Sequence, residues 1–206
     1  MKAPLYIIVD VSGSMNEMGK IHLQRNLCRY ATQLRLIDHD KYSGTDIRFY
    51  QWAQSVSEVA LQSDGDMPAL NAEGSSKLWV LSDFFSQHLN DTGRSMVLIL
   101  SDGNFPNSDI VSFQSQLGRF TDLIIRTVAV GADADLLKLK KLATNSTVYL
   151  SENIASAIDS TIFGSDEPLV APSSTAQIPQ SAPAENTRTT GGLGCLINSG
   201  IPGVPQ

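Results

Sequence analysis

The sequence predicts an α/β protein with a doubly wound, mostly parallel sheet and helices on both faces. Short apolar runs, typical of buried strands, alternate with segments whose apolar residues recur every three or four positions. Alternation of this kind is typical of a parallel sheet with crossover helices. Two strand-like runs, 47–53 and 56–61, are separated only by Gln54-Ser55. We interpret them as a hairpin that adds one antiparallel edge strand.

The first half of the chain begins with a buried strand at 5–9, which is apolar throughout. A helix over 23–37 follows, with one apolar stripe and a polar opposite face. After the hairpin, a polar loop at 63–75 leads to a second amphipathic helix over 78–89.

The second half continues the alternation without an internal repeat. We expect three strands and three helices, in the order strand 96–100, helix 110–120, strand 123–130, helix 136–142, strand 148–150 and helix 154–163. Asp133 or Asp135 is the expected N-cap of the helix over 136–142.

The composition changes after Gly164, so we predict one domain at 1–164 and a tail at 165–206. Residues 165–190 contain four prolines among Ser, Thr, Ala and Gln, which is typical of a disordered linker. The more apolar stretch 191–198 is interpreted as an unstructured end, with a short docking peptide as the alternative.

Charge and cysteine content restrict the classes of partner. The net charge of −6 argues against nucleic-acid binding, which requires a basic face. Cys28 and Cys195 form neither a metal-ligand spacing nor a disulfide framework. No apolar run is long enough for a signal-peptide core or a transmembrane helix, so we expect a cytoplasmic protein without membrane contact.

The loop after the first strand carries the most informative motif. Asp10-Val11-Ser12-Gly13-Ser14 puts one carboxylate and two hydroxyls within a few residues, and Gly13 permits the backbone to turn them toward one point. Converging hard oxygen ligands suit Mg²⁺, which favours octahedral oxygen coordination and usually keeps waters. Taken alone, the loop is equally compatible with a hydrophilic turn in which Asp10 and Ser12 cap the next helix.

Two further loops strengthen the metal interpretation. Asp102 follows the buried strand at 96–100, so a second acid stands at the carboxyl end of a strand. Parallel strands deliver their following loops to one edge of the sheet, where these acids can meet. Ser75 or Ser76, just before the second helix, offers a further hydroxyl. Three loops are therefore predicted to hold one cation.

These three pieces, in this order, resemble the metal-ion-dependent adhesion site (MIDAS) of the von Willebrand factor type A (vWA) family. The resemblance covers roughly residues 3–163 and implies a Rossmann-like vWA fold. It implies that Ser12 and Ser14 bind Mg²⁺, or Mn²⁺ in its place, directly, and that Asp10 and Asp102 bind it directly or through water. The family usually has Thr in the middle loop, where this chain offers Ser75 or Ser76.

The resemblance also implies a function. An ion held mainly by hydroxyls keeps positive charge and can capture an Asp or Glu side chain of another protein. Asp133-Ala134-Asp135-Leu136 resembles short bacterial members found with tellurium-resistance and stress-response operons, which act beside a kinase and a phosphatase. The implied role is a cytoplasmic adaptor or scaffold, with a kinase or phosphatase as a candidate partner.

Three apolar side chains near the predicted ion are candidates for contact with that partner. Phe105 follows Asp102-Gly103, in a loop where an apolar side chain has no evident packing role, and Met15 and Met18 flank the first loop.

An enzyme and a purely structural module are the alternatives. Asp10 could accept a phosphoryl group, but the second acid of haloacid dehalogenase-type phosphotransferases is replaced by Ser12, and no acidic pair precedes Asp10 as in response regulators. No G-x-S-x-G motif is present, and the histidines have no acid–serine pattern around them. We therefore predict no catalytic activity. The third possibility is an α/β module with a non-functional metal site.

Overall fold

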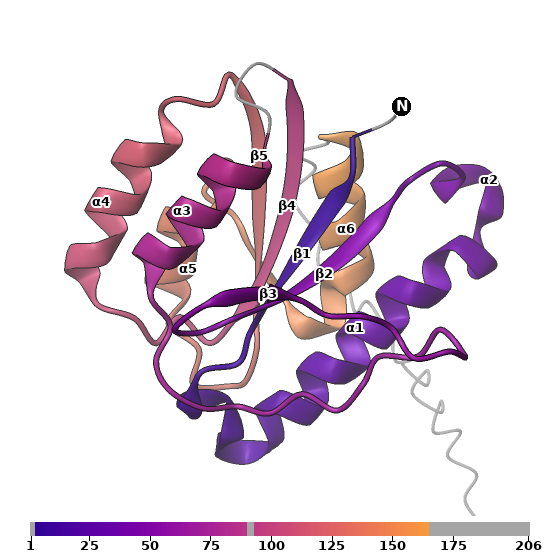
Figure 1. Ribbon diagram of the computed structural model, residues 1–206, viewed down its shortest axis with the longest axis horizontal. Coiled ribbons are helices and arrows are strands. Elements are labelled where there is room, and N and C mark those ends of the chain that lie inside the picture. Colours follow the sequence, from indigo (N-terminus) through magenta and orange to yellow (C-terminus); the bar gives the residue numbers. More distant parts are fainter. Residues whose placement is uncertain (1–2, 90–92, 165–206) are drawn as a thin grey trace, which may run out of the picture. The chain divides into compact units, whose positions relative to one another are not determined.

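The computed structural model describes residues 3–89 and 93–164, which contain a six-stranded sheet in the order β3-β2-β1-β4-β5-β6 (Figure 1). All neighbouring strands are parallel except β2 and β3, which are antiparallel. This confirms the predicted mostly parallel sheet with one antiparallel edge strand. The strands are β1 Leu5–Asp10, β2 Ile47–Trp52, β3 Val56–Glu58, β4 Arg94–Ser101, β5 Asp122–Ala129 and β6 Val148–Leu150.

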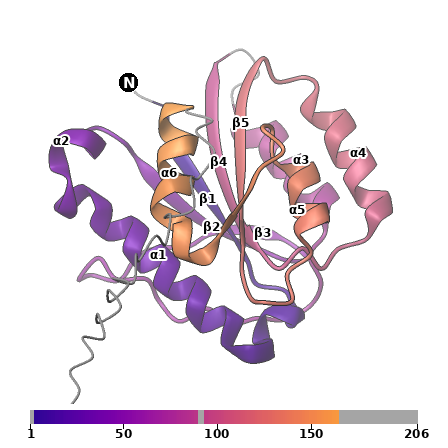
Figure 2. The ribbon, with the colours of Figure 1, turned by 180° about the vertical axis from the view of Figure 1, so that it is seen from behind.

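Helices cover both faces of the sheet, as Figures 1 and 2 show from opposite sides. Helices α1 and α6 contribute to the core on one face, and α3, α4 and α5 contribute to the core on the other. The helices are η1 Gly13–Gly19, α1 Lys20–Ile37, α2 His39–Tyr42, α3 Leu78–His88, α4 Asn107–Leu117, α5 Leu136–Leu142, η2 Ser151–Asn153 and α6 Ile154–Phe163.

The central strand β1 explains why the sequence showed an uninterrupted apolar run. Leu5, Ile7 and Val9 enter the core beneath α1 and α6, whereas Tyr6 and Ile8 enter the core beneath α3 to α5. Successive side chains of a strand point to opposite faces, so a strand covered on both sides must be apolar at every position.

Several predicted boundaries were wrong, and the helix expected over 110–120 is α4, Asn107–Leu117. The first helix begins at Lys20 rather than near residue 23, after a 3-10 segment that ends at Gly19 in a left-handed conformation (φ 73°). Strand β3 ends at Glu58 rather than at residue 61. The Gln62 N–H already bonds to the Asp66 carbonyl, because the chain has turned into the following loop. Asp135 is the N-cap of α5, since its side chain accepts from the Lys138 N–H.

The strand order places a switch point beside β1. The chain passes from β1 to β2 on one side and later returns to β4 on the other. Loops that follow β1 and β4 therefore leave the sheet at adjacent carboxyl ends, which is where ligands bind in open α/β sheets. The predicted tail at 165–206 lies outside the described residues, and the boundary at 164 stays a prediction.

Candidate metal site at the carboxyl edge of the sheet

Asp10 is the last residue of β1 and has no exposed surface. Its Oδ1 accepts hydrogen bonds from the Ser12 N–H at 2.9 Å and the Ser76 hydroxyl at 2.8 Å. Its Oδ2 accepts from the Ser101 hydroxyl at 2.6 Å. Burial raises the pKa of the Asp10 carboxyl, and the hydrogen bonds from Ser101, Ser12 and Ser76 oppose that shift without cancelling it. Asp10 is thus held in a fixed orientation, in an environment that disfavours its charge.

The first and middle loops are joined by their backbones. The Gly13 N–H donates to the Gly74 carbonyl at 2.9 Å, and the Glu73 N–H donates to the Val11 carbonyl at 2.8 Å. A Cβ at Gly13 would lie 3.3 Å from the Gly74 oxygen, so a small residue favours this approach. The first and middle loops therefore lie side by side, as the sequence predicted.

Hydroxyl groups converge beside Asp10. The Ser12 and Ser14 hydroxyl oxygens lie 3.2 Å apart, and Ser12 is buried while Ser14 is partly exposed. Two hydroxyls at this separation present neighbouring oxygens, the arrangement that an oxygen-coordinated cation requires.

The middle loop brings Ser76, and not Ser75, to Asp10. Ser76 is buried and donates to the carboxylate, whereas Ser75 is exposed. Of the two serines that the sequence left open, Ser76 therefore lies with the other predicted ligands, and its role as a ligand stays a prediction.

Asp102 lies in the third loop and is linked to Asp10 through the strand end. Ser101, which donates to Asp10, accepts from the Gly103 N–H at 3.0 Å and so shapes the turn that carries Asp102. The Asp102 Oδ1 accepts from the Asn104 N–H at 3.0 Å, and its Oδ2 accepts from the Lys20 ammonium at 2.9 Å.

Lys20, Ser101 and Asp133 belong to this edge and were missed as site residues by the sequence analysis. The Lys20 ammonium also donates to Asp133 at 2.8 Å, although Lys20 itself is only 1 % exposed. Burial by itself would lower the pKa of Lys20. The hydrogen bonds to Asp133 and Asp102 outweigh this effect, so the pKa of Lys20 is raised. A serine directly before Asp102 was a visible signal, whereas nothing local pointed to the pairing of Lys20 with residues far along the chain.

Two of the three predicted partner contacts are buried. Met15 has no exposed surface, and Phe105 is 3 % exposed, with its ring centroid 6.2 Å from that of Trp52. The expectation that Phe105 has no packing role is wrong, because it fills the core beneath α3 to α5. Met18 is 73 % exposed, so it alone of the three presents a free apolar side chain.

The donor set suits a hard divalent cation. Within 3–89 and 93–164, no group of three or more His, Cys, Asp and Glu side chains is placed to hold a metal. The hydroxyl oxygens of Ser12, Ser14 and Ser76 nonetheless gather at one strand end, beside the buried carboxylate of Asp10, whose pKa is raised. Such donors fit Mg²⁺ or Mn²⁺ better than thiolate-seeking metals.

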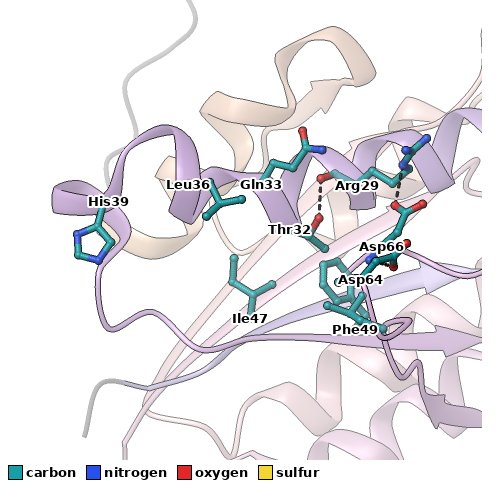
Figure 3. A pocket seen from close by; sticks show the side chains of 11 residues that line it. Arg29, Thr32, Gln33, Leu36, His39, Ile47, Phe49, Asp64 and Asp66 are labelled. Carbon is teal, nitrogen blue, oxygen red and sulfur yellow. Dashed lines mark hydrogen bonds and ion pairs between the residues drawn. The ribbon is translucent and has the colours of Figure 1, made fainter.

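A separate groove lies between α1, strand β2 and the loop that follows β3 (Figure 3). It encloses about 600 Å³, and apolar Leu36, Ile47 and Phe49 share its lining with polar groups. Arg29 on its rim is ion-paired with Asp66 at 2.7 Å. This groove does not include any of the predicted metal ligands.

Comparison with known proteins finds solved structures of similar fold. No protein-family profile and no curated protein sequence matches the chain. Among solved structures, the chain is similar to proximal thread matrix protein 1 from the mussel byssus with a zinc-occupied MIDAS motif (14% identity, 76% of this chain and 45% of that one, TM-score 0.56). It is also similar to the ArnB paralog VWA2 from Sulfolobus acidocaldarius (16% identity, 78% and 46%, TM-score 0.54).

A third similar structure is the manganese-loaded TRAP protein of Plasmodium vivax (13% identity, 78% of this chain and 73% of that one, TM-score 0.51). The chain spans less than half the length of the mussel and Sulfolobus proteins. At these identities the likeness concerns the fold, which is the Rossmann-like fold of vWA domains. No helix in the described part of the chain combines the length and apolar character needed to cross a membrane.

Proposed function

We propose that this protein is a metal-dependent protein-interaction module in which a bound Mg²⁺, or Mn²⁺ in its place, captures an Asp or Glu side chain of a partner. The observation that carries the proposal is the convergence of the Ser12, Ser14 and Ser76 hydroxyls around the buried strand end at Asp10. The vWA fold, and the zinc- and manganese-loaded members of that fold among the similar structures, support it.

In this proposal, Ser12, Ser14 and Ser76 supply hydroxyl oxygens, and Asp10 and Asp102 supply carboxylate oxygens directly or through water. When bound, the ion supplies a Lewis-acidic position for an incoming carboxylate. Few direct carboxylates leave the ion with positive charge, which favours an anionic ligand. Of the three predicted contact residues, Met18 is the one exposed to a partner.

In this proposal the protein binds a partner and has no catalytic role. The second acid that a haloacid dehalogenase-type phosphotransferase needs is replaced by Ser12, so we propose no phospho-accepting role for Asp10. The resemblance to tellurium-resistance-associated vWA proteins makes a cytoplasmic kinase or phosphatase the first partner to test.

Affinity capture with the intact chain tests the proposal. We expect a partner to be retained in Mg²⁺ and released by EDTA, and we expect Asp10→Ala to lose it. Ser75→Ala is the matched control, since Ser75 is exposed beside the buried Ser76. Equal retention by the wild type, with or without EDTA, and by Asp10→Ala would refute the proposal.

A further inference from the structure

Lys20 is a buried cation at the point where three loops meet, next to the buried acids of this edge. It starts α1, yet its ammonium bonds to Asp102 after β4 at 2.9 Å and to Asp133 after β5 at 2.8 Å. It therefore ties together segments that follow three different strands.

The backbone around Lys20 is shaped for this contact. Gly131 has φ +95°, and a Cβ there would lie only 2.6 Å from the Lys20 Cδ and 2.8 Å from the Asp133 Oδ1. A side chain at residue 131 would collide with the path of the lysine. The Asp135 N–H donates to the Asp102 carbonyl at 2.8 Å, which fixes the two acidic loops against each other.

Lys20 shares an open cleft of about 240 Å³ with Ser14 and Asp102, two of the proposed metal ligands. The Asp102 carboxylate already accepts one hydrogen bond on each oxygen, from Lys20 and from the Asn104 backbone. Each carboxylate oxygen keeps a further lone pair, so Asp102 can still serve the ion, but it must share its charge with the ammonium.

We propose that Lys20 is a positioning residue that sets the charge of the metal site: by sharing Asp102, it weakens cation binding and leaves the bound cation more attractive to a partner's carboxylate. This inference rests on the proposed function. The physical reason is electrostatic. An ammonium beside a ligand of a divalent cation repels that cation, and the same ammonium attracts the incoming carboxylate.

The proposal predicts opposite changes in two affinities, which distinguishes it from a purely structural role. Lys20→Met should bind Mn²⁺ about tenfold more tightly than the wild type, and its bound Mn²⁺ should take up acetate about tenfold less well. Lys20→Arg keeps the charge and should restore both affinities toward wild-type values. A merely structural lysine would give a methionine variant that is weaker in both.

Asp133→Asn supplies an independent test should Lys20→Met fail to fold. The Asp133 side chain is 41 % exposed, and this variant leaves Lys20 its ion pair with the buried Asp102. The Lys20 charge then acts more strongly on Asp102. We expect weaker Mn²⁺ binding and stronger uptake of acetate by the loaded site.

The measurements use the full chain, with free Mn²⁺ followed by electron paramagnetic resonance and acetate uptake followed by water-proton relaxation of bound Mn²⁺. A wild-type chain that binds no Mn²⁺ would overturn the proposed function itself. A wild type that binds Mn²⁺, with Lys20→Met binding it no more tightly or taking up acetate equally well, would overturn only the role of Lys20. Unchanged or tighter Mn²⁺ binding by Asp133→Asn would also overturn that role.

Discussion

Two buried aspartates end neighbouring strands of this sheet, and they differ in their partners. Asp10, the last residue of β1, receives hydrogen bonds from the Ser12 backbone and from two serine hydroxyls, which are all neutral groups. Asp102, after β4, receives the Lys20 ammonium. Both residues are at most 4 % exposed, so depth of burial does not distinguish them. The difference between them is the presence of a counter-charge.

This comparison shows that one sequence signal, an acid after a buried apolar strand, has two physical outcomes. At Asp102 the protein itself supplies a cation. At Asp10 the carboxylate is oriented by hydroxyls, and burial raises its pKa. A divalent cation would favour its charged form. We therefore expect Asp102 to matter for stability without metal, and Asp10 to matter for the response to metal.

The largest effect on stability in EDTA is expected from Asp102→Asn. It leaves the buried Lys20 ammonium with only Asp133, and breaking a buried ion pair costs about 3 kcal/mol. Asp10→Asn removes a buried charge but keeps only one acceptor oxygen, so at least one serine hydroxyl loses its acceptor and the cost should be about 1 kcal/mol. Urea unfolding measures both. Equal losses would show that the two strand ends do not differ in this way.

The next effect is the response of Asp10→Asn to Mg²⁺. At a concentration about 100-fold above its dissociation constant, Mg²⁺ should stabilise the wild type by about 2.7 kcal/mol. Asp10→Asn should show no such gain, because the central carboxylate of the proposed site is lost. Thermal unfolding with and without Mg²⁺ checks this. A variant stabilised as much as the wild type would contradict the placement of the metal at Asp10.

A smaller effect is expected from the hydroxyl groups that orient Asp10. Ser76→Ala removes a hydrogen bond to the buried carboxylate and should cost about 1 kcal/mol in EDTA, together with part of the gain from Mg²⁺. The exposed neighbour provides the control, since Ser75→Ala should change stability by less than about 0.5 kcal/mol. The reverse ranking in urea unfolding would assign the middle-loop role to Ser75.

The smallest expected effect is a difference in how the stability of the metal-free protein depends on pH. The folded-state pKa of Asp10 is raised, so its contribution to stability is fully present below the unfolded pKa and is lost as pH rises through the folded pKa. The folded-state pKa of Asp133 is lowered, chiefly by the hydrogen bond from Lys20. Its contribution is present above the unfolded pKa and is lost as pH falls through the folded pKa.

Unfolding of Asp10→Asn and Asp133→Asn in EDTA, from acid to neutral pH, measures how the stability of each variant changes with pH. Relative to the wild type, Asp10→Asn should gain stability as pH rises, and Asp133→Asn should lose it. Differences of the same sign in the two variants would contradict the contrast between the strand ends.

The alternation of strands and helices, and the loops that carry the two acids, could be anticipated, because the information is local. A strand covered on both faces is apolar at every position, as 5–9 and 96–100 are, and an amphipathic helix shows its stripe along a few turns. The acids after those strands then fall at one edge by the rules of parallel sheets. The edge strand β3 was also foreseen, although its length was not.

The wrong expectations concern side chains whose environment comes from distant segments. Phe105 looked like a free loop residue, but Trp52 of β2 packs against it. Met15 lies in a short helix after the first loop and is completely buried. Trp52 is far from Phe105 in the sequence, so no local pattern signals that the phenylalanine is buried.

The sequence by itself determined the alternation of strands and helices, and with it the acids and hydroxyls at the carboxyl edge, since these depend on periodicity and on order along the chain. Only the tertiary structure decided that Ser76 rather than Ser75 bonds to Asp10, and that Lys20 reaches Asp133, 113 residues away. Such contacts depend on how loops from different strands approach one another, and hydrogen bonds and ion pairs form only within a few ångströms.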